Sequence, residues 1–158
     1  MSKYIARLVT VGIAKESSRG AGATPVYTLP FAKLSFDDKI VQARSSGALG
    51  YLADSEEAFV TTKYGQGDVD MEMRSKSIGL ILYALFGSYS VAGPSDSAYT
   101  HSFTIANTNQ HQSLSFVIVD LNTTELYKLV MIDSMKVSAA LDKVVSFTLG
   151  FLSKTARD

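Results

Sequence analysis

Apolar and polar residues alternate along most of the chain, a pattern typical of strands that bury one face. Residues 99–105 show the alternation most clearly, with aromatic or apolar side chains on one face and Ser or Thr on the other. Residues 114–119 are apolar on both faces, which indicates a central strand of a sheet. The sequence therefore predicts a mainly β protein.

Short polar turns divide the C-terminal part of the chain into runs of strand length. Asn122-Thr123 and Asp142-Lys143 each separate two apolar runs, and Asp133-Ser134 has the same character. Tight polar turns between alternating runs are typical of antiparallel hairpins. Residues 113–152 are therefore predicted to form a four-stranded antiparallel meander.

One stretch has the periodicity of a helix. In GDVDMEMRSKSIGLILYALFG, residues 67–87, the apolar positions after residue 77 recur at helical spacing. Ser75 or Ser77 can cap the start of a helix here, and Gly87 can end it. We predict one flanking α-helix over about residues 76–86, covered by sheets or by neighbouring subunits because it is apolar on nearly all sides. An apolar run of about nine residues is too short to cross a bilayer.

Three segments lack a regular pattern and are predicted to be loops: residues 15–25, 37–57 and 87–98. The first belongs to a predicted N-terminal arm over residues 1–25. About twenty residues without pattern inside a compact domain are typical of a functional or interface loop, which is how we interpret residues 37–57. No linker divides the sequence, so residues 1–158 are predicted to form a single domain.

The composition favours a folded protein whose surface is taken up by neighbours. Hydrophobic residues make up 46% of the 158 positions and charged residues 19%, with 15 basic and 15 acidic side chains. A neutral chain of low charge density does not have the composition of a strongly basic nucleic-acid binder or of a highly soluble monomer. The sequence has no cysteine, which excludes disulfides and thiolate metal sites.

Three carboxylates mark the first half of the 67–87 stretch. Asp68, Asp70 and Glu72 occupy alternate positions, so a strand would present them on one face. They could act as acid and base or collect a hard cation, but Met73 stands where a calcium loop requires glycine. Nothing in the sequence selectively buries one carboxylate, as a glycosidase pair would need. A solvated, non-catalytic acidic face is the favoured interpretation.

The other candidates for chemistry are weaker. His101 and His111 are ten residues apart, which is not a metal-ligand spacing, and a hydrogen-bonded structural role is favoured for His101. The run from Gly20 to Ala23 precedes a proline and not a helix, so it is a poor phosphate loop. The sequence predicts no catalytic residue, no metal site and no cofactor.

Three pieces of the sequence, in this order, resemble the major tail tube proteins of long-tailed, siphovirus-type bacteriophages. The first, GIAKESSRGAGATPVYTLPF (residues 12–31), is similar to that family's N-terminal element and the short strand after it. The second is the 67–87 stretch, which resembles the family's acidic strand and single packed helix. The third, YTHSFTIANTNQHQSLSFVIVD (residues 99–120), resembles a strand, a loop and a second strand, with Gln112 where proline is common.

The resemblance implies an antiparallel β-sandwich or barrel-like tail tube fold with one flanking helix, and no enzymatic activity. It further implies stacked, hexameric rings whose inner sheets join into a continuous barrel. Such a tube houses the tape-measure protein, meets the tail terminator and distal tail proteins, and conducts double-stranded DNA during genome ejection. The expected location is the virion tail, with the host cytoplasm during assembly, and no membrane partner is expected.

Two hypotheses about sites follow from this resemblance. Asp68, Asp70 and Glu72 are predicted to face or lie near the lumen, where negative charge repels DNA and lets it slide. The loop over residues 37–57 is predicted to reach an adjacent subunit or ring through ionic and apolar contacts. Its candidate contact residues are Arg44, Leu49, Tyr51, Leu52, Asp54, Glu56 and Glu57.

Other classes of protein stay open at the level of sequence. A tube of a contractile tail or of a secretion system would share the fold. A β-sandwich carbohydrate-binding module would need exposed coplanar aromatic side chains, although the chain has no tryptophan. Its candidate aromatics are Tyr51, Tyr64, Tyr89 and Tyr99. An enzyme using Asp70 and Glu72 is the least favoured alternative.

Overall fold

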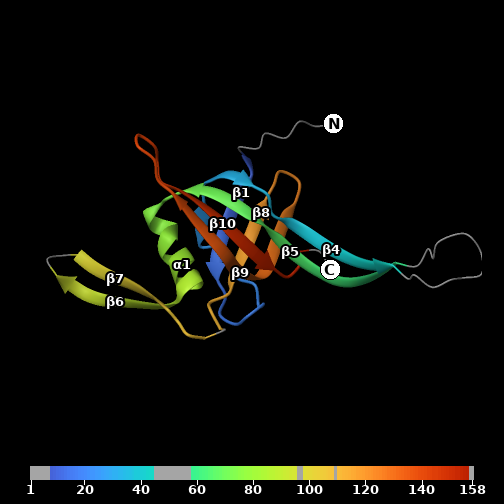
Figure 1. Cartoon of the computed structure of the whole chain (residues 1–158), viewed down its shortest axis with the longest axis horizontal. Coiled ribbons are helices and arrows are strands. Elements are labelled where there is room, and N and C mark those ends of the chain that lie inside the picture. Colours follow the sequence, from blue (N-terminus) through green and yellow to red (C-terminus); the bar gives the residue numbers. More distant parts are fainter. Residues whose placement is uncertain (1–7, 45–57, 96–97, 109, 157–158) are drawn as a thin grey trace, which may run out of the picture.

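The computed structural model describes residues 8–44, 58–95, 98–108 and 110–156. Ten strands and one helix lie in these ranges (Figure 1). In chain order they are β1 (Thr10–Lys15), β2 (Tyr27–Leu29), β3 (Phe31–Leu34), β4 (Asp37–Arg44), β5 (Ala58–Glu72), α1 (Ser75–Phe86), β6 (Gly87–Ser95), β7 (Ala98–Ile105), β8 (Leu114–Val119), β9 (Thr124–Ser138) and β10 (Ser146–Ser153). The prediction of a mainly antiparallel β protein with a single helix is confirmed.

The main sheet is rolled so that its two ends approach each other. Its strand order is β2-β1-β8-β9-β10-β5-β3, with β4 also paired to β5, and every pairing is antiparallel. The first and last strands of this order, β2 and β3, are separated in sequence only by Pro30. A chain cannot place consecutive strands at opposite ends of a flat sheet, so the sheet must curve into a barrel-like shape.

The interior of the rolled sheet forms the hydrophobic core. Strand β8 is buried at five consecutive positions, as expected for a central strand. Phe36, between β3 and β4, packs its ring against Phe116, Tyr127 and Phe151, with centroids 5.3, 4.6 and 6.4 Å away. The helix adds Ile81 and Ala84 to the same core. Burial of these large side chains is the main stabilising contribution to the fold.

The helix ends as predicted, but it begins differently. Gly87 adopts a left-handed conformation with φ of 83°, and its N–H donates to the carbonyl of Tyr83. At the other end the N-cap is Arg74, and neither Ser75 nor Ser77 supplies a side-chain cap. Ser77 is instead buried, and its hydroxyl has no hydrogen-bond partner among the described residues, so the serine-cap prediction is wrong.

The predicted four-stranded meander has three strands, β8, β9 and β10. Strand β9 runs unbroken for 15 residues through Asp133-Ser134, so the predicted turn there is wrong. Asp133 lies at a shift of register between β9 and β10, where one extra residue is absorbed as a bulge. A bulge and a turn favour the same small polar residues, so the local sequence does not separate them.

Strands lie in three segments that were predicted to be an arm or loops. Strand β1 is largely buried, so residues 10–15 belong to the sheet and not to an N-terminal arm. Residues 37–44 are strand β4, which corrects the predicted loop over residues 37–57. Residues 87–95 are strand β6 and not a loop, and they pair with β7 in a two-stranded sheet. The hairpins β4–β5 and β6–β7 project from opposite ends of the body (Figure 1).

Candidate functional site

The polar sheet face is the outward face of β3, β5, β10 and the C-terminal half of β9. On β5, Val69 and Met71 are buried, Asp70 between them is half-buried, and Asp68 and Glu72 on either side are exposed. Asp68, Asp70 and Glu72 therefore share one face, as a strand requires. Directly opposite them on β10 are Gly150, Thr148 and Ser146. Opposite those on β9 are Ser134, Lys136 and Ser138.

Two lysines moderate the negative charge of the polar sheet face. Lys33 on β3 lies opposite Asp70, and Lys136 on β9 continues the same row across Thr148. With Asp68 and Glu72, these rows carry three carboxylates against two ammonium groups. Asp133 and Lys39 line a small pocket beside Asp68 and add one charge of each sign, so the formal charge of the face is −1. The predicted acidic face is therefore only weakly acidic, and hydroxyl groups make up much of the rest.

The carboxylates of this face are held differently. The Thr148 hydroxyl donates to Asp70 Oδ1 at 2.6 Å, which fixes the half-buried Asp70 against β10. Glu72 Oε2 lies 3.6 Å from the Arg74 guanidinium, but both side chains are more than half exposed, so this ion pair stabilises little. None of the three is enclosed as a general acid would be. The arrangement suits a hydrated surface better than an acid–base pair.

Only one of the predicted contact residues of the 37–57 segment lies in the described part of the chain. Arg44 is the exposed last residue of β4. The remaining six, Leu49, Tyr51, Leu52, Asp54, Glu56 and Glu57, lie outside the described residues. The described part of this hairpin, which we call the β4–β5 arm, instead exposes apolar side chains. These are Ile40, Val41, Phe59 and Val60, each at least 45% exposed.

Sequence reasoning missed Glu16, which is the one buried carboxylate among the described residues. It follows β1 directly, and only 2% of its surface is exposed. Oε2 accepts hydrogen bonds from the Gly20 N–H at 2.7 Å and the Ser113 hydroxyl at 2.8 Å. Oε1 accepts from the Leu129 N–H at 2.9 Å and the Ser115 hydroxyl at 3.0 Å. Each carboxylate oxygen thus receives one backbone donor and one hydroxyl donor.

The Glu16 carboxylate stays ionised although it is buried. Burial raises its pKa, but the hydrogen bonds from Leu129, Gly20, Ser113 and Ser115 together outweigh this effect and lower the pKa below its ordinary value of 4.5. Leu129 has a positive φ of 54°, rare for a bulky residue, at the point where β9 shifts its register against β8. Glu16 therefore secures the strained bulge at which β9 passes from β8 to β10.

The two histidines have structural partners. His101 Nδ1 lies 2.9 Å from the Tyr89 hydroxyl, which agrees with the predicted structural role. His111 lies beside the C-terminal end of α1. Its Nδ1 is 2.9 Å from the Leu85 carbonyl and its Nε2 is 3.2 Å from the Ala106 carbonyl. Within the described ranges, no three His, Cys, Asp or Glu side chains come together to hold a metal ion. In the same ranges, no helix has the length and hydropathy needed to cross a membrane.

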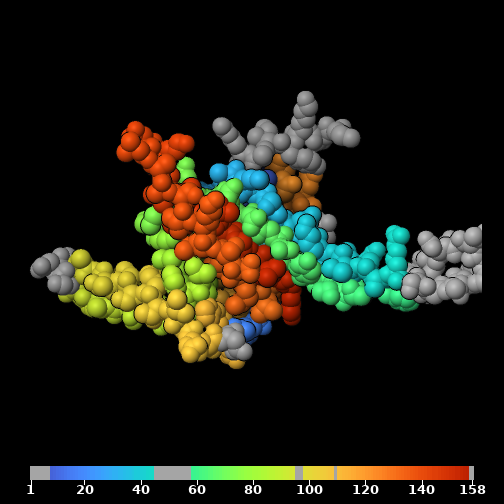
Figure 2. All heavy atoms as spheres, viewed as in Figure 1, coloured from blue at the N-terminus to red at the C-terminus, as the bar shows by residue number. Residues whose placement is uncertain are grey.

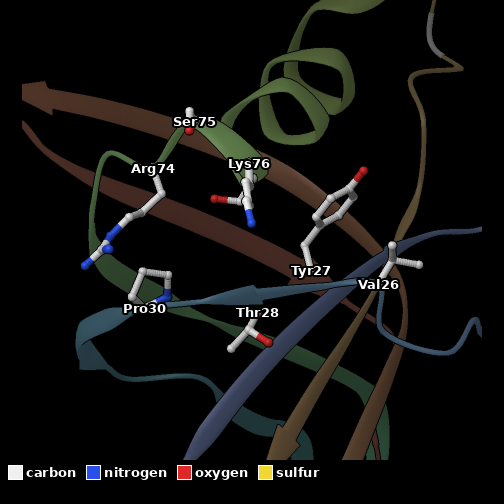
Figure 3. Close-up of a pocket in the computed structure, with 8 residues that line it drawn as sticks. Val26, Tyr27, Thr28, Pro30, Arg74, Ser75 and Lys76 are labelled. Carbon is white, nitrogen blue, oxygen red and sulfur yellow. The ribbon is translucent and has the colours of Figure 1, made fainter.

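An open cleft of about 630 Å³ lies between β2 and the first turn of α1. Figure 3 shows Arg74 and Lys76 around it, together with Pro30 and Tyr27. Its full lining is Val26, Tyr27, Thr28, Pro30, Arg74, Ser75, Lys76 and Ser77. None of these side chains is a carboxylate, an imidazole or a thiol.

The described residues form a rolled antiparallel sheet with one flanking helix, a polar outward face and two projecting hairpins, which is a β-rich fold. Comparison with known families makes the class specific. The family model described as phage tail tube protein matches residues 6–158. The chain therefore belongs to the phage tail tube protein family, and as a tail tube protein it is a component of the virion.

Solved structures similar to this chain are also tail proteins. The tail of an empty GTA particle, refined with C6 helical symmetry, is 11% identical, with 96% of this chain and 94% of that chain covered and a TM-score of 0.48. The SPP1 tail tube is 10% identical, with 96% of this chain and 76% of that chain covered and a TM-score of 0.45. No curated protein matches the chain.

Proposed function

We propose that copies of this chain form hexameric rings that stack into the tail tube of a siphovirus-type phage. The tube houses the tape-measure protein and conducts double-stranded DNA during ejection, and its ends meet the terminator and distal tail proteins. Subunits assemble in the host cytoplasm. Membership of the tail tube family supports this proposal, and it favours a tube over a carbohydrate-binding module.

The unpaired strand edges of the polar sheet carry the proposal. Strand β9 pairs with β8 only up to Val130, so within the described residues its edge from Met131 to Ser138 is free on that side. At the far side of the sheet, β4 pairs only with β5 in the described part of the chain. Free edges are templates for pairing with another strand, and a closed barrel removes them.

The strand directions of the β9 and β4 edges allow one copy to pair with the next in a head-to-tail ring. Strands β9, β10, β5 and β4 alternate in direction, because each adjacent pair is antiparallel. With an even number of strands, β9 of one copy would meet β4 of the next in antiparallel orientation. The same pairing repeats around a ring without reversing any copy. Such a ring would turn the polar sheet face of every copy toward one side, which we assign to the lumen.

The polar sheet face has the chemistry of a DNA conduit. Its hydroxyl groups keep it hydrated, and Asp68, Asp70 and Glu72 outnumber Lys33 and Lys136. Each phosphate contact made by a cation strengthens DNA binding, so a weakly negative wall favours passage over capture. The β4–β5 arm, with its exposed apolar side chains, is assigned to contact with an adjacent copy or ring.

Negative-stain microscopy of the purified chain tests assembly. Hollow tubes about 100 Å wide are expected from packing several domains of this size around a pore. Deleting residues 44–54 should leave a folded subunit that no longer forms tubes. A wild-type chain that stays monomeric at high concentration would refute the proposed function. Normal tubes from the deletion variant would refute the predicted role of residues 44–54 in contacts between copies.

A charge-neutralising variant tests the lumen assignment. The triple substitution Asp68→Asn, Asp70→Asn and Glu72→Gln changes the formal charge of the polar sheet face from −1 to +2. Tubes should still form, and short double-stranded DNA should pass more slowly and be retained more strongly at low salt. Asp142→Asn, in the β9–β10 turn, is the control. If the triple variant retains DNA as wild type does, the assignment of these residues to the lumen is wrong.

A further inference from the structure

The β6–β7 hairpin has one aromatic face and one hydroxyl face. Cross-strand pairing places Tyr89 opposite Phe103, Val91 opposite His101 and Gly87 opposite Ile105. We call this the aromatic hairpin face, and Tyr99 belongs to it by alternation along β7. The opposite face pairs Ser88 with Thr104, Ser90 with Ser102 and Ala92 with Thr100. An alternation this regular is typical of a ribbon that buries one face.

No described residue of the single chain covers the aromatic hairpin face. Tyr89 is 44% exposed, Val91 46%, Tyr99 61% and Ile105 78%. At about 150–250 Å² for a large aromatic side chain, these residues leave roughly 400 Å² of largely apolar surface open. This is as large as the largest such patch on a typical monomer, and such patches mark interaction sites. A two-stranded hairpin is also marginally stable by itself, so it gains from being covered.

The exposed rings are ordered among themselves. The Tyr89 and His101 rings stack with centroids 5.9 Å apart, and the Tyr89 hydroxyl lies 2.9 Å from His101 Nδ1. Tyr89 also packs against Phe103 at 5.2 Å and against Tyr83 of α1 at 6.2 Å. The hairpin therefore presents a pre-organised surface anchored to the helix, and little ordering entropy is lost when it docks.

We propose that the aromatic hairpin face docks on a second copy of this chain, against a surface other than that copy's own hairpin face. This inference rests on the proposed function, because a tube repeats one chain. Heterologous assembly needs two different surfaces per copy, and the hairpin and the β4–β5 arm project from opposite ends of the body (Figure 2).

The side chains of the β6–β7 hairpin favour a protein over a nucleic acid as its binding partner. Residues 87–95 and 98–105 include no Lys, Arg, Asp or Glu, so they supply no cation for a phosphate. The open area is about half of the roughly 800 Å² that one partner contributes to a standard interface. The hairpin is therefore large enough for one of two contacts made by each copy, with the β4–β5 arm as the other.

Cysteine labelling tests the docking directly, because the chain has no native cysteine. Tyr99→Cys reports on the aromatic hairpin face, and the neighbouring Thr100→Cys reports on the hydroxyl face of the same strand. Both should react with a maleimide in the monomer. In assembled tubes, the labelling rate of Tyr99→Cys should fall by about tenfold or more, while that of Thr100→Cys stays high. Equal reactivity of Tyr99→Cys in monomer and tube, or protection of both positions, overturns the proposal.

A second measurement does not depend on labelling. Ile105→Asp should raise the concentration needed for assembly by about tenfold to a hundredfold, because it charges a surface that must be buried. Thr104→Asp, on the hydroxyl face, is the matched control. Circular dichroism of both variants checks that the monomer folds.

The outcomes separate this inference from the proposed function. Wild-type tubes together with normal tubes from Ile105→Asp overturn the docking proposal and leave tube formation intact. A wild-type chain that forms no tubes refutes the proposed function itself, and the docking proposal falls with it. If oxidation of Ile105→Cys tubes links hairpin to hairpin in disulfide dimers, the contact is isologous and the proposed heterologous docking is wrong.

Discussion

Replacing Glu16 by glutamine changes the shape of the side chain very little, but it should destabilise the subunit strongly. Oε2 accepts from the Gly20 N–H and Oε1 from the Leu129 N–H. Whichever way a glutamine amide turns, its nitrogen must face one of these two backbone donors. No rotation of the side chain avoids this conflict.

The size of the loss in unfolding free energy depends on which of the hydrogen-bond donors to Glu16 can find another acceptor. The hydroxyls of Ser113 and Ser115 can rotate, and Ser115 Oγ already accepts from the Ala23 N–H at 2.8 Å. A buried backbone N–H cannot turn away, and leaving one unsatisfied costs about 1–3 kcal/mol. With the loss of charge-assisted bonds, we expect Glu16→Gln to lower the free energy of unfolding by about 2–3 kcal/mol. Glu16→Ala leaves both N–H groups without the carboxylate and should cost about 3–5 kcal/mol.

Urea unfolding at a concentration where the chain is monomeric measures this effect. Glu72→Gln is the matched control, because Glu72 is an exposed carboxylate and its loss should change stability by about 0.5 kcal/mol at most. If Glu16→Gln unfolds within that margin of wild type, Glu16 does not stabilise the bulge as we infer.

The effect of Glu16 should depend on pH in a defined direction. The folded state lowers the pKa of Glu16 below 4.5, so its carboxylate contributes stability that is fully present above pH 4.5. This contribution is lost as the pH falls through the folded-state pKa. The stability difference between wild type and Glu16→Gln should therefore shrink on the acid side of pH 4.5. A difference that grows with acidification would contradict the assignment.

Three further substitutions test the packing, each by urea unfolding of the monomer. Gly67→Ala should destabilise by several kcal/mol, on the order of 3, because its Cβ would collide with backbone atoms of Ser35 and Phe36. Gly79→Ala, in α1 with nothing within 4 Å of the added Cβ, should instead stabilise by about 0.5–1 kcal/mol. Phe36→Ala should cost about 3–5 kcal/mol, because it empties the aromatic contact with Tyr127. Equal effects of the two glycine substitutions would contradict this description of the backbone contacts.

The local pattern of the sequence determined the elements that depend on neighbours close in the chain. Strand β8 follows from an apolar run, β7 from alternation, and α1 from helical spacing that ends at Gly87. The shared face of Asp68, Asp70 and Glu72 follows from the twofold period of a strand alone. These features could be predicted because a few consecutive residues contain the whole signal.

Features that depend on pairing partners could not be predicted in this way. Residues 87–95 are rich in Ser, Gly and Pro, yet they form β6 because β7 lies beside them. Residues 37–44 form β4 because β5 supplies a partner strand. Asp133 became a bulge and not a turn because β10 continues beside β9 past that point. In each case tertiary pairing overrides a weak local preference.

The sequence by itself determined a β-rich chain with one helix, an acidic stripe on one strand and a resemblance to tail tube proteins. Only the tertiary structure brought Lys33 and Lys136 onto the acidic face, left the aromatic hairpin face uncovered and buried Glu16. The partners of Glu16 lie up to 113 residues away in sequence. Periodicity reports which side of an element is buried, whereas the identity of the groups that meet there is decided by how the sheet rolls up.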